Sequence, residues 1–387
     1  MSPEISKNMT NNRRTFIKSA IGASAGIFAA GRISAHTFSP YSLPLIKKSQ
    51  TPRIRFSVIG LNHGHIYGQV NTVIRGGGEL VAFYAKEDNL AAEFTKSFPQ
   101  AKRVQTEAEI LEDNSIQLVV SASIPSERAP LGIRVMEHGK DFMVDKPGII
   151  SLLQLADVRK VQKKTGRIYS ILYGERLESK ATIKAAGLIQ AGAIGNVVQT
   201  IGMGPHRMNA PTRPEWFFDK KYFGGIICDI GSHQFDQFLF LTGSTSAKIL
   251  ASQVGNVHYP QYPQFEDFGD AVIQGNRGSG YIRVDWFTPD GLNTWGDGRL
   301  TVLGTDGYIE IRKNVDIAGR NGGDHLFLID QKSTQYIDCR DVDLPYGRRL
   351  VDDIINRTET AMKQEICFLA TELTLLAQKN ATKMSKI

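Results

Sequence analysis

Residues 53–65, RIRFSVIGLNHGH, run from a strand into a glycine turn and then toward a helix. β-Branched and aromatic side chains occur along the whole of RIRFSVI, which is typical of a strand covered on both faces. The strand ends at Gly60, and a helical pattern follows through about Arg75. A turn between a strand and a helix presents backbone N–H groups and the positive end of the helix, so it favours an anion such as a phosphate.

The same alternation of strands and helices continues up to residue 147. Apolar runs at 79–85, 116–123 and 141–147 predict strands, and NLAAEFTKSF and RAPLGIRVMEHG between them predict helices. Strands that alternate with helices and are apolar throughout indicate a parallel sheet with helices on both faces. We therefore expect residues 52–175 to form a doubly wound Rossmann domain that binds NAD or NADP.

Beyond Lys180 the pattern changes to strands with one apolar face, which predicts a large, mainly antiparallel sheet flanked by helices. The alternating segments lie at 270–276, 279–289, 299–313 and 324–330. The stretch 350–380 has apolar residues at helical spacing and predicts one or two terminal helices that partly pack back on the Rossmann domain. The expected fold class is α/β plus α+β, with residues 176–387 as a domain for substrate binding and oligomerisation.

The N-terminus has the features of a twin-arginine signal peptide. The pair Arg13-Arg14 precedes an apolar run that is too short and too rich in glycine and alanine to span a bilayer, and Ile33-Ser34-Ala35 offers small residues for cleavage. We expect residues 1–35 to be removed, residues 36–51 to be a linker, and the mature protein to be periplasmic without a membrane anchor. Because no pool of free dinucleotide exists outside the cytoplasm, such a protein would need a tightly bound cofactor.

The charge balance argues against a nucleic-acid-binding protein. The chain has 46 lysines and arginines against 39 acidic residues, but much of the excess lies in the predicted signal peptide, and no later stretch interleaves basic clusters with aromatics. Its three cysteines are scattered and lack the spacing of a zinc site or a redox pair. The expected partner is therefore a small molecule, not a nucleic acid.

The glycine turn departs from the usual GxGxxG spacing. Gly60 is in register, but Asn62 takes the second position and His65 the third. Asparagine tolerates a positive φ better than most residues, so the turn itself can survive. His63 and His65 could lie near phosphate or substrate, or form part of a metal site. A pair two residues apart in a turn more often makes local hydrogen bonds, so we predict no metal.

The second predicted strand ends in Ala85-Lys86-Glu87, where a Rossmann domain usually has an acid that binds the ribose 2′-hydroxyl. The lysine would tolerate a 2′-phosphate, which slightly favours NADP over NAD. Glu87 could still reach the ribose, so both dinucleotides stay open.

Asp145-Lys146-Pro147 and the run DIGSHQFD at 229–236 occur in an order and separation that resemble the glucose-fructose oxidoreductase / inositol dehydrogenase (Gfo/Idh/MocA) family, whose hallmark at the first position is Glu-Lys-Pro. Arg176 and the run LGTDG at 303–307 extend the resemblance over roughly residues 53–380. The resemblance implies an NAD(P)-dependent oxidoreductase that acts on a sugar, polyol or glycoside. It also implies a homo-oligomer, a dimer or tetramer, assembled through the open face of the second sheet.

Oxidation of an alcohol needs the residue types found in these motifs. The hydroxyl loses a proton as a hydride leaves for the nicotinamide, and a lysine beside a cationic ring has its charged form disfavoured, so Lys146 can accept or share that proton. Asp229 and His233 are four residues apart, which on a helical turn places both on one face. We expect His233 to be a general acid or base with an ordinary pKa near 6.5. Asp229 would bind substrate hydroxyls or tune Lys146.

Further residues are expected to line the two binding sites. The dinucleotide would contact Gly60, Asn62, His63, Gly64, His65, Lys86, Ser123, Pro125, Asp145 and Lys146. The sugar pocket would be lined by Tyr173, Arg176, His206 and Trp295.

Two alternatives to net oxidation stay open. A nicotinamide-dependent glycosidase or lyase would oxidise its substrate transiently, eliminate the aglycone and return the hydride, and it needs no external oxidant, which suits an exported enzyme. A catalytically silent binding protein of the same fold would account for the eroded glycine motif and the missing ribose acid.

Overall fold

The strand at the start of the glycine turn lies in the middle of a six-stranded parallel sheet. The computed structural model describes residues 52–384, and the predicted signal peptide and linker lie outside the described residues. The strands follow the order β3-β2-β1-β4-β5-β6, and each neighbouring pair is parallel. Their bounds are β1 (Ile54–Ile59), β2 (Gly78–Tyr84), β3 (Lys102–Arg103), β4 (Leu118–Ser121), β5 (Asp141–Asp145) and β6 (Tyr169–Leu172).

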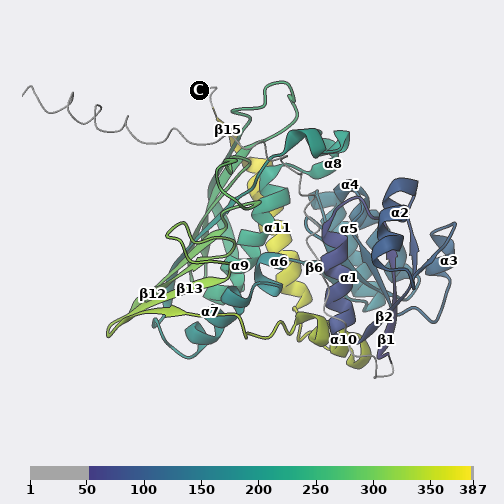
Figure 1. Cartoon of the computed structure of the whole chain (residues 1–387), viewed down its shortest axis with the longest axis horizontal. Coiled ribbons are helices and arrows are strands. Elements are labelled where there is room, and N and C mark those ends of the chain that lie inside the picture. The colour runs from purple at the N-terminus through teal and green to yellow at the C-terminus, as the bar shows by residue number, and fades with distance from the viewer. Residues whose placement is uncertain (1–51, 385–387) are drawn as a thin grey trace, which may run out of the picture. The chain divides into compact units, whose positions relative to one another are not determined.

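The strand order fixes where a ligand can bind. From β1 the chain proceeds to β2 and β3 on one side and then returns to β4 on the other side of β1. In open α/β sheets the ligand lies outside the carboxyl ends of the strands at such a reversal. Five helices flank this sheet: α1 (His65–Arg75), α2 (Asp88–Ser97), α3 (Ala108–Leu111), α4 (Pro125–Glu137) and α5 (Leu152–Thr165) (Figure 1).

Local signals in the sequence account for these helices. On α1, Ile66 and Val70 are fully buried and lie one turn apart, so the helix packs an apolar stripe onto the sheet. α5 begins after Ser151, whose hydroxyl accepts a hydrogen bond from the backbone N–H of Gln154. It ends at Gly166, whose φ of 64° lies in the left-handed region that glycine adopts at no steric cost.

The second half of the chain forms a nine-stranded sheet in the order β14-β13-β12-β11-β7-β10-β9-β8-β15. Neighbours are antiparallel except the pairs β7 with β10 and β8 with β15, which confirms the predicted fold class. The strands are β7 (Val197–Pro205), β8 (Ala247–Gly255), β9 (Phe268–Gly275), β10 (Gly278–Asp285), β11 (Arg299–Gly304), β12 (Gly307–Arg312), β13 (His325–Asp330), β14 (Thr334–Ile337) and β15 (Thr382–Lys383).

Helices cover the face of this sheet that is turned toward the parallel sheet (Figure 1). Gly202 and Gly204 on β7 let α9 approach closely, because a Cβ at either position would lie 2.9 Å from the side chain of Gln234. The helical segments are α6 (Gly174–Leu177), α7 (Lys180–Gln190), η1 (Ala210–Thr212), η2 (Glu215–Phe218), α8 (Lys220–Phe223), the π-helical turn η3 (Ile227–Gly231), α9 (Ser232–Thr242), α10 (Tyr346–Asn356) and α11 (Gln364–Asn380).

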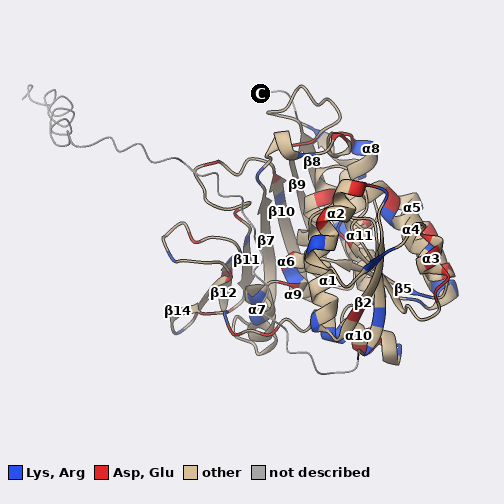
Figure 2. Cartoon of the chain, turned by 45° about the vertical axis from the view of Figure 1, so that its right-hand side comes forward, with Lys and Arg blue, Asp and Glu red and all other residues tan. Residues whose placement is uncertain are grey.

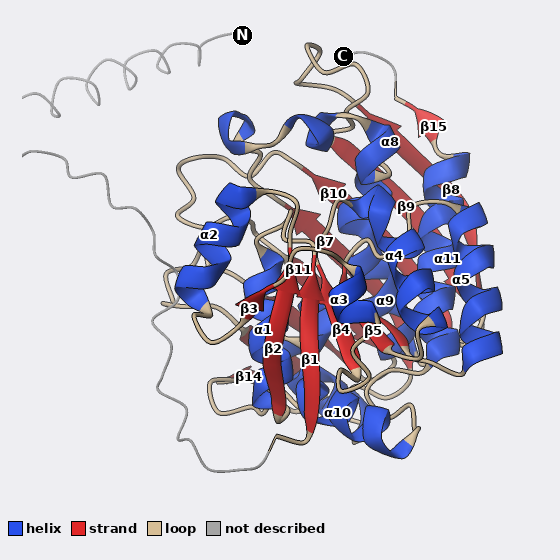
Figure 3. Ribbon diagram, turned by 90° about the vertical axis from the view of Figure 1, so that its right-hand side faces the viewer, coloured by secondary structure: helices blue, strands red, loops and turns tan. Residues whose placement is uncertain are grey.

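The last two helices tie the two sheets together. α10 packs against α1, while α11 contacts α5 and β6 on one side and α9 and β8 on the other. Figure 3 shows α5 and α11 side by side along one edge of the molecule. One continuous apolar core therefore runs through both halves of the described chain.

Surface charges are mixed in sign. Figure 2 shows lysines and arginines interspersed with acidic residues over α2 to α5. None of the helices within residues 52–384 combines the length and apolar character that a membrane span needs.

Candidate functional site

The glycine turn after β1 is built around Gly60. Its φ is +86°, and a Cβ at this position would lie 2.6 Å from the Cβ of Ser123 in the turn after β4. No side chain other than hydrogen fits without movement of one of the two segments. The carboxyl ends of β1 and β4 thus approach each other closely at the point where the sheet reverses direction.

A cavity of about 310 Å³ opens beside this turn. Its wall comes from the turn itself, the end of β2, the turn after β4 and helix α4, and it includes Gly60, Asn62, Lys86, Glu87 and Ser123. The glycine cradle and the cavity fit the adenosine end of a dinucleotide, which binds at this place in a Rossmann sheet. The sequence-predicted contacts Gly64 and Pro125 lie just outside this wall, at the starts of α1 and α4.

The acidic side chain of Glu87 and the basic side chain of Lys86, both just after β2, are held differently. The Asn62 Nδ2 donates a hydrogen bond of 2.8 Å to the Glu87 Oε1, so the glutamate is fixed in the cavity wall. Lys86 is exposed, and its Nζ is 3.5 Å from the Glu127 Oε1. Of the two groups in this wall, Glu87 is therefore the more firmly held.

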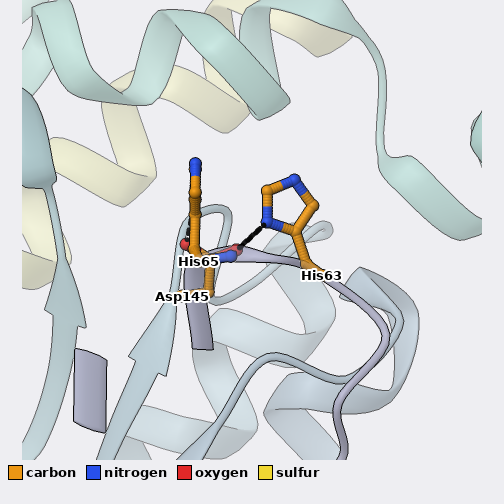
Figure 4. Close-up of side chains that lie close together, drawn as sticks. All are labelled: His63, His65 and Asp145. Atoms are coloured by element: carbon orange, nitrogen blue, oxygen red, sulfur yellow. Dashed lines mark hydrogen bonds and ion pairs between the residues drawn. The ribbon is translucent and has the colours of Figure 1, made fainter. Parts of the chain in front are cut away.

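Both histidines of the turn reach the acid of the Asp-Lys-Pro motif (Figure 4). The His65 Nδ1 is 3.0 Å from the Asp145 Oδ1, and the His63 Nδ1 is 3.3 Å from the Asp145 Oδ2. Burial opposes ionisation of Asp145, but the neighbouring charges of His65 and Arg128 hold its pKa well below the usual range. Burial, together with the charge of His65, lowers the pKa of His63 well below its usual value.

Arg128 on α4 was not identified from the sequence. Its side chain is fully buried and donates to the backbone oxygens of Ser123 at 2.7 Å and of Lys146 at 2.6 Å, while its Nη2 donates to the Asp145 Oδ2 at 3.2 Å. One guanidinium thus fixes the turn after β4 to the Asp-Lys-Pro segment. A signal for it exists in the sequence, because Arg128 lies on the apolar face of a helix, at the position four residues before Gly132.

Lys146 and Asp229 come together across the two halves of the chain. The Lys146 Nζ donates a 2.9 Å hydrogen bond to the Asp229 Oδ1, and both side chains are largely buried. Asp229 lies in the π-helical turn η3, an irregularity that occurs often at functional sites. His233 is the second residue of the next helix, α9, but neither Lys146 nor Asp229 makes a hydrogen bond to it, and its buried Nδ1 has no partner among the described residues.

The expectation of an ordinary pKa for His233 is wrong. Burial lowers its pKa to about 3, against the opposing charge of Glu175. The imidazole is therefore neutral near pH 7. Amphipathic spacing could not reveal this, since α9 is buried on nearly all sides.

Glu175 is a second residue that the sequence did not single out. Its buried carboxylate pairs with the Lys313 ammonium and accepts a 2.9 Å hydrogen bond from the Gln234 Nε2. Burial would raise the pKa of Glu175, but the charges of Lys313 and His233 lower it to about 2. A fixed negative charge therefore lies near His233.

Two of the predicted sugar contacts are engaged inside the fold. The buried Tyr173 hydroxyl is 3.1 Å from the Thr371 Oγ1, and the buried Arg176 guanidinium donates two hydrogen bonds, of 2.5 and 2.8 Å, to Asp236. These groups are already paired, so the geometry argues against their predicted contact with substrate. They instead fasten β6 and α6 to α11 and α9.

The other two predicted sugar contacts form part of an aromatic wall. The rings of His206 and Trp295 are 4.7 Å apart and edge to face, and Trp295 is 53% exposed. The His206 Nδ1 lies 3.1 Å from the Gly204 carbonyl oxygen, and burial lowers its pKa to about 4. A neutral imidazole and an exposed indole suit contact with an uncharged, hydroxyl-rich molecule.

Comparison with known proteins agrees with this arrangement. Residues 54–173 match the family "Oxidoreductase family, NAD-binding Rossmann fold", and residues 182–310 match the "GFO/IDH/MocA C-terminal domain". The scyllo-inositol 2-dehydrogenase (NAD(+)) of Bacillus subtilis (strain 168) is 27% identical over 266 residues, which are 67% of this chain and 74% of the relative.

Solved structures share the fold over most of the chain. A crystal structure of a proposed oxidoreductase from Erwinia carotovora atroseptica SCRI1043 is 44% identical, covers 86% of this chain and 100% of that chain, and has a TM-score of 0.84. A levoglucosan dehydrogenase in complex with NADH and levoglucosan, at 16% identity and a TM-score of 0.69 over 84% of this chain and 95% of that one, shares the fold. The chain therefore belongs to the Gfo/Idh/MocA family and is an NAD(P)-dependent oxidoreductase that acts on CH–OH groups.

Proposed function

We propose that this enzyme oxidises a secondary alcohol of a sugar, polyol or glycoside, with Lys146 as the group that takes the hydroxyl proton. The buried pair of Lys146 and Asp229, with 2.9 Å between Nζ and Oδ1, carries the proposal. This pair joins the end of β5, beside the nucleotide turn, to the turn η3 in the other half of the chain. A bound nicotinamide supplies the hydride acceptor.

We propose a separate task for each of the three residues. When the Lys146 side chain is present as the amine, it can take the proton of a hydroxyl within about 3 Å of Nζ, and the Asp229 carboxylate, 2.9 Å away, pairs with the ammonium that forms. Lys146 is 5% exposed, and little water competes for that position. We propose that the neutral imidazole of His233 makes a hydrogen bond to a second hydroxyl of the same substrate.

The first test is the substitution Lys146→Met. We expect kcat/KM for an active sugar or polyol to fall by about 100- to 10,000-fold, since general acid or base catalysis contributes that much. The absorbance of reduced nicotinamide measures turnover across a panel of inositols and pyranosides. Lys96→Met, which removes an exposed lysine of α2, is the control and should retain full activity. Undiminished turnover by Lys146→Met would contradict the proposal.

The cofactor is proposed to be bound tightly, and Glu87 leads us to favour NAD over NADP. Because Asn62 fixes Glu87 in the cavity wall, its carboxylate can accept from a ribose hydroxyl and repels a 2′-phosphate. This reverses the slight preference for NADP that Lys86 suggested.

Glu87→Ser should therefore improve binding of NADP relative to NAD by at least about tenfold, which corresponds to 1.4 kcal/mol. Fluorescence titration of both dinucleotides measures the ratio, and Glu93→Ser on the exposed side of α2 is the control. Wild-type preference for NADP would refute the assignment to Glu87.

Release of a dinucleotide when the purified protein is denatured tests tight binding. The absence of both release and stabilisation by added NAD or NADP would favour a catalytically silent binding protein.

Redox-neutral cleavage of a glycoside is the second candidate, and the Arg13-Arg14 leader favours it. We infer that residues 1–35 direct export to the periplasm, where no soluble dinucleotide pool would accept the electrons of a net oxidation. Product analysis without added cofactor separates the two reactions, because cleavage proceeds with bound cofactor alone, whereas net oxidation stops after one turnover.

A further inference from the structure

Three side chains with metal-binding atoms converge beside the nucleotide turn. His63 and His65 come from the turn after β1, and Asp145 ends β5, two strands away in the sheet. Figure 4 shows both imidazoles standing over the same carboxylate. We propose that His63, His65 and Asp145 bind one divalent transition-metal cation, with Zn²⁺ as the expected ion. The local hydrogen bond that the sequence predicts is present, because the His65 backbone N–H donates to the His63 Nδ1 at 3.2 Å, and a bound metal ion would take its place at that nitrogen.

The distances suit coordination with little movement. One ligand atom from each residue lies within 4.8 Å of the other two, and the Nδ1 atoms of His65 and His63 are 3.0 and 3.3 Å from the oxygens of Asp145. Zinc bonds of about 2.0 to 2.2 Å in a tetrahedral site place neighbouring ligand atoms roughly 3.3 Å apart. Two imidazole nitrogens and one carboxylate oxygen are a donor set that suits zinc and related divalent transition metals.

The surroundings hold the carboxylate in position for a cation. Arg128 donates to the Asp145 Oδ2 at 3.2 Å and also to the backbone oxygens of Asp145 and Lys146, so the end of β5 cannot turn away. The Oδ1 makes no bond to Arg128; it lies 3.0 Å from the His65 Nδ1, and a metal ion could take its place between the two atoms. Such hydrogen bonds to a ligating carboxylate are a regular part of metal sites.

Three protein ligands leave a fourth position open for water or an oxygen of a small molecule. Arg128 and Lys146 add positive charge nearby, so an oxygen anion is the preferred occupant of that position. Asp145 immediately precedes Lys146 in the chain, which places the cation next to the group proposed to take the substrate proton. Metal binding itself does not depend on the proposed alcohol oxidation.

The experiment is a metal titration of the tag-free mature protein after dialysis against a chelator. Co²⁺ serves as the spectroscopic probe, because its visible spectrum reports low coordination number and nitrogen ligands, and Zn²⁺ is then added as a competitor. We expect one equivalent of metal to bind to the wild type. Affinity should fall by at least about tenfold in His65→Ala and in Asp145→Asn. Zn²⁺ should raise the Tm of the wild type and leave that of His65→Ala unchanged.

His258→Ala and His138→Ala are the matched controls, since both remove an exposed imidazole far from the cluster in sequence. Both controls should bind metal like the wild type. Absence of stoichiometric binding, or binding that survives His65→Ala and is lost in a control, would overturn the proposal. Because His65 is exposed, His65→Ala should fold normally, and circular dichroism of the metal-free variants verifies this.

Discussion

At the scale of single residues, the neutral His233 makes the stability of the fold depend on pH. Its pKa is about 3 in the folded chain and about 6.5 when unfolded, so between these values only the unfolded chain binds the proton. Stability is thus fully present above pH 6.5 and is lost as the pH falls from 6.5 toward 3. When the pH is lowered from 7.5 to 5, the free energy of unfolding of the wild type should fall by about 2 kcal/mol because of this group.

The variant His233→Asn lacks this titrating group. Between pH 7.5 and pH 5 its free energy of unfolding should therefore fall by about 2 kcal/mol less than that of the wild type. Urea unfolding at the two pH values measures both proteins. His138→Asn, which changes an exposed histidine, should behave like the wild type. Equal pH dependence in wild type and His233→Asn would show that the folded chain leaves this imidazole accessible to protons.

At the scale of elements, the close approach of β1 and β4 depends on Gly60. Gly60→Ala would force a side chain into a positive φ of 86° and against Ser123, at a cost of about 1 to 3 kcal/mol. We expect a lower Tm and weaker dinucleotide binding, measured by thermal unfolding with and without NAD. Gly64→Ala, where a Cβ meets nothing within 4 Å and φ is −62°, should change little. If Gly60→Ala changes neither the Tm nor dinucleotide binding, the ends of β1 and β4 must be able to move apart enough to admit a Cβ.

The elements themselves were largely predictable, because their signals are local. The apolar run at 116–123 contains β4, and the alternating segment at 324–330 contains β13. The π-helical turn η3 was not predictable, since the spacing of Asp229 and His233 is also compatible with an ordinary α-helix. Its position depends on the close packing of α9 onto glycines of β7, a contact between segments far apart in the chain.

At the scale of the whole molecule, the sequence showed which motifs meet but not which side chains stay free. Lys146 and Asp229 were expected together and lie 2.9 Å apart. Arg176 belongs to the same group of motifs, yet it is neutralised by the buried Asp236. Whether a charged group faces a pocket or another charge depends on tertiary pairing, and residue type alone carries no information about it.

The open face of the nine-stranded sheet is where we propose that the homo-oligomer assembles. Ile201, Tyr281 and Val272 lie directly opposite one another on the neighbouring strands β7, β10 and β9. Leu303 and Tyr308 pair in the adjacent row on β11 and β12, and are 44% and 39% exposed. Exposed apolar side chains such as these, on a sheet whose other face is covered by helices within residues 52–384 (Figure 1), are typical of an association surface.

Leu303→Arg places a charge within this patch, and in a symmetric assembly it meets the same patch of a second copy. We therefore expect light scattering after size exclusion to show a dimer or tetramer for the wild type and a shift toward the monomer for Leu303→Arg. Leu153→Arg is the matched control, because Leu153 on α5 is 74% exposed and lies away from this sheet. It should assemble like the wild type. A monomeric wild type, or an assembly that Leu303→Arg leaves intact, would exclude this face as the interface.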